Sequence, residues 1–240
     1  MSHLSKPILG TQLNWAHPLN KGLAGFWLMN EGHGNKIQDL SMNGNVGTLT
    51  NMAFPPTAAS GWNPGRKGIG LKFDGVNDSV NCGNGLTLNL SQDFTIAFWA
   101  LNPSALLGMI ISKTDVVIGS NGGIQLFFRA SNPYFRILIS DGSAAGALAS
   151  TTYAPDNNFH FFVITRNNLV ANMYIDGIFI SKLNTPQKVK TVSQSFTIGA
   201  NSFDGLTLFS GKVDQVCVWK RDLSAQEVLQ LYTDPYCMFK

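Results

Sequence analysis

Aromatic and β-branched residues form short segments along most of this chain, separated by turn-forming residues. The apolar segments are 68–74, 94–101, 123–130, 135–141, 159–166 and 169–175. Segments of about four to eight residues with this composition are typical of β-strands. The pattern therefore predicts strands along nearly the whole chain.

Asn-Gly and Asp-Gly pairs mark the turns between these segments. They stand at 43–44, 74–75, 84–85, 121–122, 141–142, 176–177 and 204–205. The tightest hairpin turn needs a positive φ angle at both central residues, which these residue types adopt readily. The strands are short and near-regularly spaced, and the sequence holds no internal repeat. We therefore predict one all-β domain, an antiparallel jelly-roll β-sandwich.

One short C-terminal helix is predicted, over 224–232. Ser224 is suited to the N-cap, and Glu227 follows three positions later, which is the capping-box spacing. Asp234 and Pro235 end the helix, because the residue before a proline avoids the helical conformation.

The predicted strand before this helix, 211–219, carries a carboxylate in an unexpected place. Strict alternation puts Asp214 on the same face as Val216 and Val218. A carboxylate on an apolar face needs a partner, because an unpaired buried charge is very costly.

Composition narrows the classes of function. The chain has 240 residues, of which 44% are hydrophobic and only 13% are charged, and its net charge is +3. This length suits a single large β domain. Lysines and arginines form no basic stripe, so we expect no nucleic-acid partner.

Cysteine usage and the N-terminal sequence bear on the compartment. Cys82, Cys217 and Cys237 cannot all pair within one chain, and their spacing suits neither a disulfide framework nor a zinc site. We find neither the apolar run of a secretory signal nor an apolar stretch long enough to insert into a membrane. We therefore expect the chain to fold in a cytoplasm.

Several short motifs, in their order and spacing, resemble a known family. They are GFW at 25–27, NEG at 30–32, DLSMNGN at 39–45, FDGVND at 73–78, the strand 94–100, YIDG at 174–177 and the closing stretch 212–232. This series resembles the laminin-G-like jelly roll of the concanavalin A-like lectin superfamily, in its pentraxin-related branch of bacterial and phage proteins. We divide the chain into an N-terminal arm (1–21), the jelly-roll domain (22–233) and a C-terminal tail (234–240).

The chain departs from the family pattern at two places. The family often has Trp-His-His-Val where this chain has FHFFV at 159–163, and a polar residue where Cys217 stands. An apolar residue at 217 predicts an apolar outer surface there, and hence a contact with another subunit.

The segment 39–45 carries oxygen-bearing side chains at alternate positions, with a glycine suited to a tight turn. A hard cation such as calcium binds about six to eight such oxygens. The resemblance implies that the first and last segments lie side by side, which would add a carboxylate. The candidate structural calcium ligands are Asp39, Ser41, Asn43, Asn45 and Asp214. The alternative is that Asp39 and Asp214 accept hydrogen bonds from turn amides.

A sugar site would need an exposed aromatic ring beside polar groups. Trp27, Trp99 and Trp219 fall in predicted strands, so we assign them to the core. Three aromatic residues fall among turn formers and are the candidate ligand-binding residues: Trp62, Tyr134 and Phe203. The alternative is that they cap the sandwich.

The superfamily that this chain resembles includes glycoside hydrolases, which need two carboxylates across the scissile bond. This chain has only two glutamates, Glu31 in a glycine-rich turn and Glu227 in the predicted helix cap. No predicted strand carries an Asp-x-Asp or Asp-x-Glu pair. We therefore expect that the chain is not an enzyme.

The ends of the chain carry aromatic residues that are seldom left in water. Trp15, Tyr236 and Phe239 are the candidate assembly residues, docking on their own domain or on a neighbouring subunit.

Domains of this resemblance usually act outside the cell, whereas this chain has no recognisable export signal. A phage virion protein reconciles the two, because it folds in the host cytoplasm and leaves by lysis. We expect a non-enzymatic virion-associated structural or decoration protein, bound to other virion proteins or to itself, with glycans or cell surfaces as ligands. The alternatives are an extracellular, secreted or cell-surface carbohydrate-binding module and, third, a glycoside-active enzyme.

Overall fold

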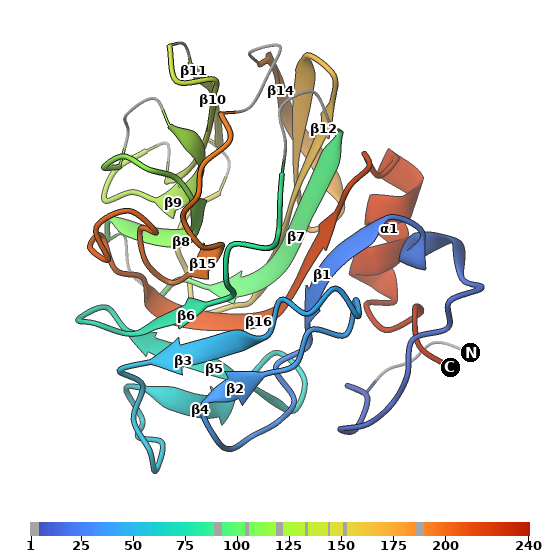
Figure 1. The fold of residues 1–240 in the computed structure, drawn as a ribbon, viewed down its shortest axis with the longest axis vertical. Coiled ribbons are helices and arrows are strands. Elements are labelled where there is room, and N and C mark those ends of the chain that lie inside the picture. The colour runs from blue at the N-terminus through green and yellow to red at the C-terminus, as the bar shows by residue number, and fades with distance from the viewer. Residues whose placement is uncertain are drawn as a thin grey trace.

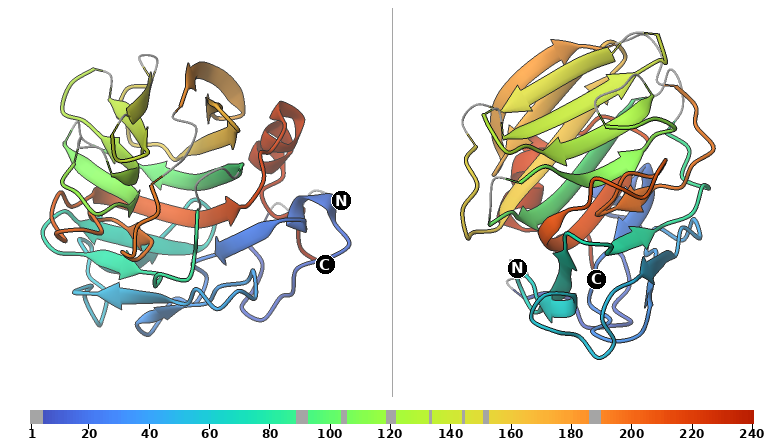
Figure 2. Two further views of the ribbon diagram at one scale, coloured as in Figure 1. Left: turned by 45° about the horizontal axis from the view of Figure 1, so that its top comes forward. Right: turned by 90° about the vertical axis from the view of Figure 1, so that its left-hand side faces the viewer.

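Two eight-stranded antiparallel sheets face each other in the computed structural model (Figure 1). It describes residues 5–88, 93–103, 106–118, 122–132, 134–143, 145–150, 153–185 and 190–240. The predicted all-β jelly-roll sandwich with one C-terminal helix is confirmed, and the two layers are seen from other directions in Figure 2.

The first sheet is built around two long central strands. In spatial order its strands are β14 (Ile178–Asn184), β13 (Val170–Ile175), β12 (His160–Asn167), β7 (Phe94–Leu101), β16 (Ser210–Trp219), β5 (Ile69–Asp74) and β4 (Gly61–Pro64), with β1 (Leu23–Trp27) paired to one end of β16.

The second sheet covers one face of the first. Its strands in spatial order are β11 (Ala145–Ser150), β10 (Phe135–Ser140), β9 (Gly123–Phe128), β8 (Gly108–Lys113), β15 (Thr197–Ile198), β6 (Ser79–Asn81), β3 (Gly47–Thr50) and β2 (Lys36–Ile37). The helical elements are a 3₁₀ turn, η1 (Pro18–Asn20), and the helix α1 (Ala225–Thr233).

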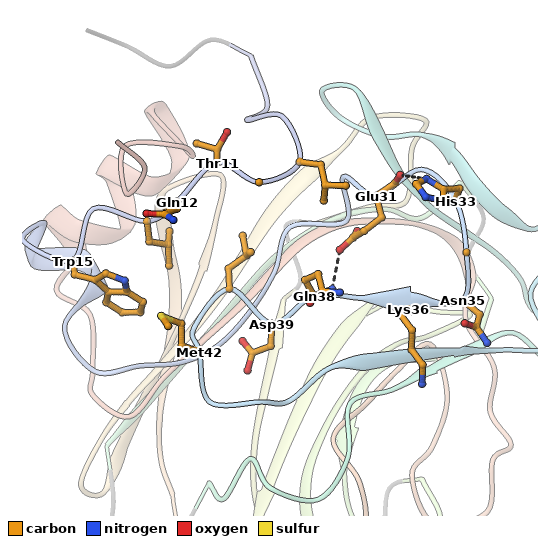
Figure 3. A pocket seen from close by; sticks show the side chains of 15 residues that line it. Thr11, Gln12, Trp15, Glu31, His33, Asn35, Lys36, Gln38, Asp39 and Met42 are labelled. Carbon is orange, nitrogen blue, oxygen red and sulfur yellow. Dashed lines mark hydrogen bonds between the residues drawn. The ribbon is translucent and has the colours of Figure 1, made fainter.

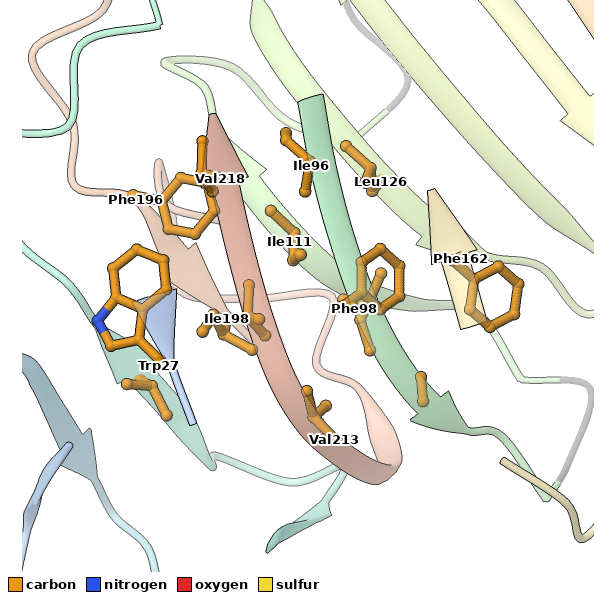
Figure 4. Packing of buried hydrophobic residues seen from close by; sticks show 14 of the residues in the cluster. Trp27, Ile96, Phe98, Ile111, Leu126, Phe162, Phe196, Ile198, Val213 and Val218 are labelled. Atoms are coloured by element: carbon orange, nitrogen blue, oxygen red, sulfur yellow. The ribbon is translucent and has the colours of Figure 1, made fainter. Parts of the chain in front are cut away.

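Aromatic side chains fill the space between the sheets. Phe98 stacks on Phe162 with ring centroids 5.3 Å apart, and Trp27 stacks on Phe196 at the same separation (Figure 4). Such pairs contribute beyond the area they bury, because their rings meet in favoured offset geometries. Trp27 is therefore a core residue, as predicted.

A second buried cluster lies on the outer face of the first sheet, beneath α1 and the two ends of the chain. Trp99 stacks there on Phe161 at 4.9 Å and on Tyr232 of the helix at 5.7 Å. Cys217 and Trp219 are also buried in this cluster. The predicted subunit contact at Cys217 is therefore wrong, because the chain covers this face itself.

A β-bulge in β16 decides which residues face this outer cluster. Asp214 pairs with Trp99 and Val216 with Phe98, so Gln215 is an extra residue, with a φ of 49°. Val213 and Val216 therefore both face the inner core. Asp214 faces outward, and the prediction that it shares a face with Val216 is wrong because strict alternation takes no account of a bulge.

The local predictions from turn and cap residues are confirmed. Ser224 is the N-cap of α1 and forms the full capping box with Glu227. Asp176 and Gly177 connect β13 to β14 with φ angles of 53° and 77°, as the hairpin turn requires.

Candidate ligand-binding groove

The N-terminal arm is fixed at its start by a buried ion pair. Lys6 Nζ contacts Asp214 Oδ1 and also donates to the carbonyl oxygens of Met29, at 3.0 Å, and of Ile69. The Lys6 and Asp214 side chains are only 5% and 2% exposed. The partner that the Asp214 carboxylate requires is therefore an ammonium group from the arm.

Backbone amides complete the environment of this carboxylate. Asp214 Oδ2 accepts a hydrogen bond of 2.9 Å from the Arg66 amide. Burial raises the pKa of Asp214 and lowers the pKa of Lys6, because the hydration lost by each group outweighs their mutual attraction.

The arm is fixed again where it meets the C-terminal tail. Leu13 forms an antiparallel bridge with Phe239, and the Asn14 amide donates to the Met238 carbonyl at 2.8 Å. The Lys240 amide donates to the carbonyl of Gln12 at 3.1 Å. Figure 1 shows the C-terminal tail on the same side of the molecule as α1.

A groove of about 940 Å³ lies between the arm and the segment 31–42 (Figure 3). The arm contributes residues 9–13 and Trp15, and the opposite wall includes Glu31, Gln38 and Met42. The volume is in the range of about 300–1,000 Å³ that is usual for small-molecule sites.

The groove combines an exposed indole ring with unengaged amide side chains. Trp15 is 48% exposed, and Figure 3 shows it across the groove from Glu31. The side chains of Gln12, Asn35 and Gln38 are exposed and form no hydrogen bond with any described residue. Each such amide offers both donors and an acceptor. A ligand with an apolar face and several hydroxyl groups fits this lining.

Glu31 contributes a carboxylate to the same wall. Its Oε1 atom accepts a hydrogen bond of 2.8 Å from the Gln38 amide, while Oε2 is buried without a partner among the described residues. Sequence reasoning treated Glu31 as a turn residue only, because no local signal shows that the arm lies opposite it.

The predicted calcium ligands are brought together only in part. Asp39 Oδ1 accepts from the amides of Phe26 and Ser41, both at 3.0 Å, and its Oδ2 accepts from the amide of Asn45 at 2.9 Å. Asp39 therefore accepts hydrogen bonds from turn amides, which is the alternative to calcium ligation given above. Asn43 lies in the same turn and its side chain donates to Ser41 Oγ at 3.0 Å.

Asp214 does not complete this set, because its carboxylate is held by Lys6 and turn amides. In the described ranges, no three His, Cys, Asp or Glu side chains gather as a metal site would require. Calcium binding by the 39–45 turn stays a prediction.

The three aromatic residues that were predicted to lie in loops are in different environments, and Trp62 is in strand β4. Trp62 is only 4% exposed and its indole donates to the Gly34 carbonyl at 2.9 Å, so its prediction as a stacking residue is wrong. Tyr134 is partly buried against the inner core. Phe203 is 50% exposed in a loop.

The three candidate assembly residues differ in their burial. Tyr236 and Phe239 are almost fully buried in the outer cluster of their own chain. This corrects the assembly prediction in favour of docking on the same domain. Trp15 alone is exposed, and it lines the groove.

A family model described as "Concanavalin A-like lectin/glucanases superfamily" matches residues 74–229, well over half of the chain. The chain belongs to the concanavalin A-like lectin/glucanase superfamily. This confirms the family expected from the motifs. A search of curated proteins finds no match to this superfamily domain.

Solved structures show the same fold at low sequence identity. The binding domain of Paraclostridial Mosquitocidal Protein 1 is similar with a TM-score of 0.68 and 18% identity, over 89% of this chain and 52% of the other. Domain 4 of AbnA, an extracellular GH43 arabinanase from Geobacillus stearothermophilus solved with arabinotriose, has a TM-score of 0.67 and 16% identity, over 88% and 98%.

A third similar structure is that of an enzyme. Trypanosoma rangeli sialidase in complex with sialic acid has a TM-score of 0.64 and 16% identity, over 91% of this chain and 34% of the enzyme.

Within the described residues, the superfamily domain has no helix that is long and apolar enough to cross a membrane.

Proposed function

We propose that this chain is a non-enzymatic carbohydrate-binding domain whose ligand occupies the groove between the arm and the segment 31–42. The observation that carries the proposal is the half-exposed indole of Trp15 in the same groove as amide side chains that form no hydrogen bond with any described residue. An indole provides a flat apolar surface for the CH groups of a sugar ring, and amides match its hydroxyl groups.

The membership in a lectin and glucanase superfamily supports this proposal, as does the arabinotriose complex of the arabinanase domain. Binding without hydrolysis is supported by the state of the carboxylates. Asp39 uses both oxygens for amide hydrogen bonds, and Glu227 is paired with Arg221 at 2.7 Å. Glu31 is then the one carboxylate lining the groove that is not saturated by amides, whereas glycoside hydrolysis uses two.

The test is a glycan array probed with the full chain, followed by calorimetry on the best ligand. Trp15→Ala is expected to weaken binding about tenfold or more, as for a central aromatic contact. Phe203→Ala is the matched control, because Phe203 is equally exposed but lies outside the groove.

Three results would count against the proposal. If Phe203→Ala abolishes binding and Trp15→Ala does not, the site is the loop around Phe203. If the folded chain binds no glycan, the carbohydrate function is wrong. Release of reducing sugar from a bound oligosaccharide would refute the non-enzymatic part.

A place on a virion is a separate proposal, supported by the resemblance to domains of phage proteins. Because Tyr236 and Phe239 are buried in their own chain, an assembly contact would use another surface. Co-sedimentation of the chain with purified particles tests this role, and a chain that stays in the supernatant contradicts it.

A further inference from the structure

We infer that the groove selects neutral glycans and discriminates against anionic ones such as sialylated chains. This inference rests on the proposed function and names the class of its ligand. It follows from the charges on the groove walls and from what each charged group already contacts.

Positive charge in the groove is already engaged. Among the described lining residues, Lys36 is the only lysine or arginine, and its Nζ donates to Thr48 Oγ1 of the neighbouring strand at 2.8 Å. Figure 3 shows this side chain directed away from Trp15 and Glu31. The His33 ring also lines the groove, with Nδ1 2.8 Å from the carbonyl oxygen of Glu31. Lys6 is outside the lining and forms its ion pair with Asp214, while attraction to Glu31 offsets a small part of the burial that lowers the pKa of Lys6. An anionic sugar would therefore find no lysine or arginine in the described lining that is directed toward Trp15 and Glu31.

Negative charge, in contrast, is held in the groove walls. The lining includes two carboxylates, Glu31 and Asp39. Glu31 has one amide donor, on Oε1, and no cationic side chain forms an ion pair with it in the part of the chain that is described. A carboxylate on the ligand would repel these groups in a partly desolvated site, where like charges interact strongly.

The remaining polar groups suit a neutral sugar. Gln12, Asn35 and Gln38 each offer donors and an acceptor, as sugar hydroxyls do. Trp15 provides the apolar surface. None of these four contacts is improved by a net charge on the ligand.

The experiment compares matched pairs of oligosaccharides that differ only by a terminal sialic acid, titrated into the full chain by calorimetry. We expect the neutral member to bind at least about tenfold more tightly, since like-charge juxtaposition is strongly unfavourable. Glu31→Gln should reduce this preference, because it removes one of the repelling charges. Lys36→Met should not reduce this preference, because Lys36 is directed to Thr48. Lys220→Met is the control that should leave it unchanged, because Lys220 is exposed and lies outside the groove.

The inference is overturned if the sialylated member binds as tightly as the neutral one, or if Lys36→Met removes binding of the sialylated member. If the unmodified chain prefers the sialylated member and Trp15→Ala loses all binding, the groove is still the binding site, but the inference that it selects neutral glycans is wrong. If neither member of any pair binds the folded chain, the proposed function itself fails.

Discussion

Replacing Lys6 by methionine tests whether the arm is held in place by its buried ion pair. The variant leaves the Asp214 carboxylate, which is 2% exposed, without the ammonium group that neutralises it. Methionine keeps most of the apolar stem, so the change removes charge more than volume. The hydrogen bond from the Arg66 amide remains.

The expected loss follows from the burial of the pair. Removing one partner of a buried ion pair costs about 3–5 kcal/mol, because the other charge is left without compensation. The amide hydrogen bond to Asp214 Oδ2 offsets part of this cost. We therefore expect the free energy of unfolding to fall by about 3 kcal/mol near neutral pH.

The loss should depend on pH with a defined sign. Burial already raises the pKa of Asp214, and the variant raises it further because the stabilising ammonium is gone. A raised folded-state pKa of a carboxyl makes its ionised form costly above that pKa, and protonation relieves the cost below it. The destabilisation should therefore be full at about pH 7 and clearly smaller at about pH 5.

The assay is urea denaturation of the full chain at both pH values, followed by tryptophan fluorescence. Lys220→Met is the control, because Lys220 is exposed and directly follows the same strand, so its loss should stay within about 0.5 kcal/mol. The double variant Lys6→Met/Asp214→Asn should recover part of the stability, since no buried charge remains. A loss below about 1 kcal/mol for Lys6→Met, or an equal loss at both pH values, would refute the reasoning.

Two further predictions concern stability. His160 lies 2.6 Å from Asp176 and 3.2 Å from Asp156, and the hydrogen bond to Asp176 is the main cause that raises the pKa of His160 above 6.5. Stability gained from the protonated ring is present below about pH 6.5 and is lost as the pH rises through the folded-state pKa, so the free energy of unfolding should fall across this range. His160→Gln should lack that fall. Equal pH dependence of the free energy of unfolding in the variant and the unmodified chain would contradict the pairing. Ser224→Ala should cost about 1 kcal/mol by removing the cap of α1, measured as a lower urea midpoint, whereas an unchanged midpoint would show that the capping box is dispensable.

Features encoded by neighbouring residues could be predicted, and features formed between distant segments could not. The capping box at Ser224 and the turn at Asp176 and Gly177 depend on a few adjacent positions, and both are present as expected. The partner of Asp214 lies 208 positions away at Lys6, and nothing in the local sequence marks it.

The groove was missed for the same reason. Its walls come from the arm and from the segment 31–42, and neither carries a complete site. The turn-forming neighbours of Trp62 suggest exposure, whereas its side chain is buried and its indole donates a hydrogen bond to the Gly34 carbonyl. The sequence around Trp15 predicts an assembly contact, and only the folded arm shows that Trp15 lines the groove.

The bulge at Gln215 also bears on how the length of this strand can change in evolution. Inserting or deleting one residue in a regular strand exchanges its inward and outward faces, because the side chains alternate with a period of two. At the bulge, the ladder passes from Asp214 to Val216 without counting Gln215, so Val213 and Val216 keep the same face. Position 215 is therefore a point where this strand can lose a residue while its valines stay in the core and its carboxylate stays beneath the arm.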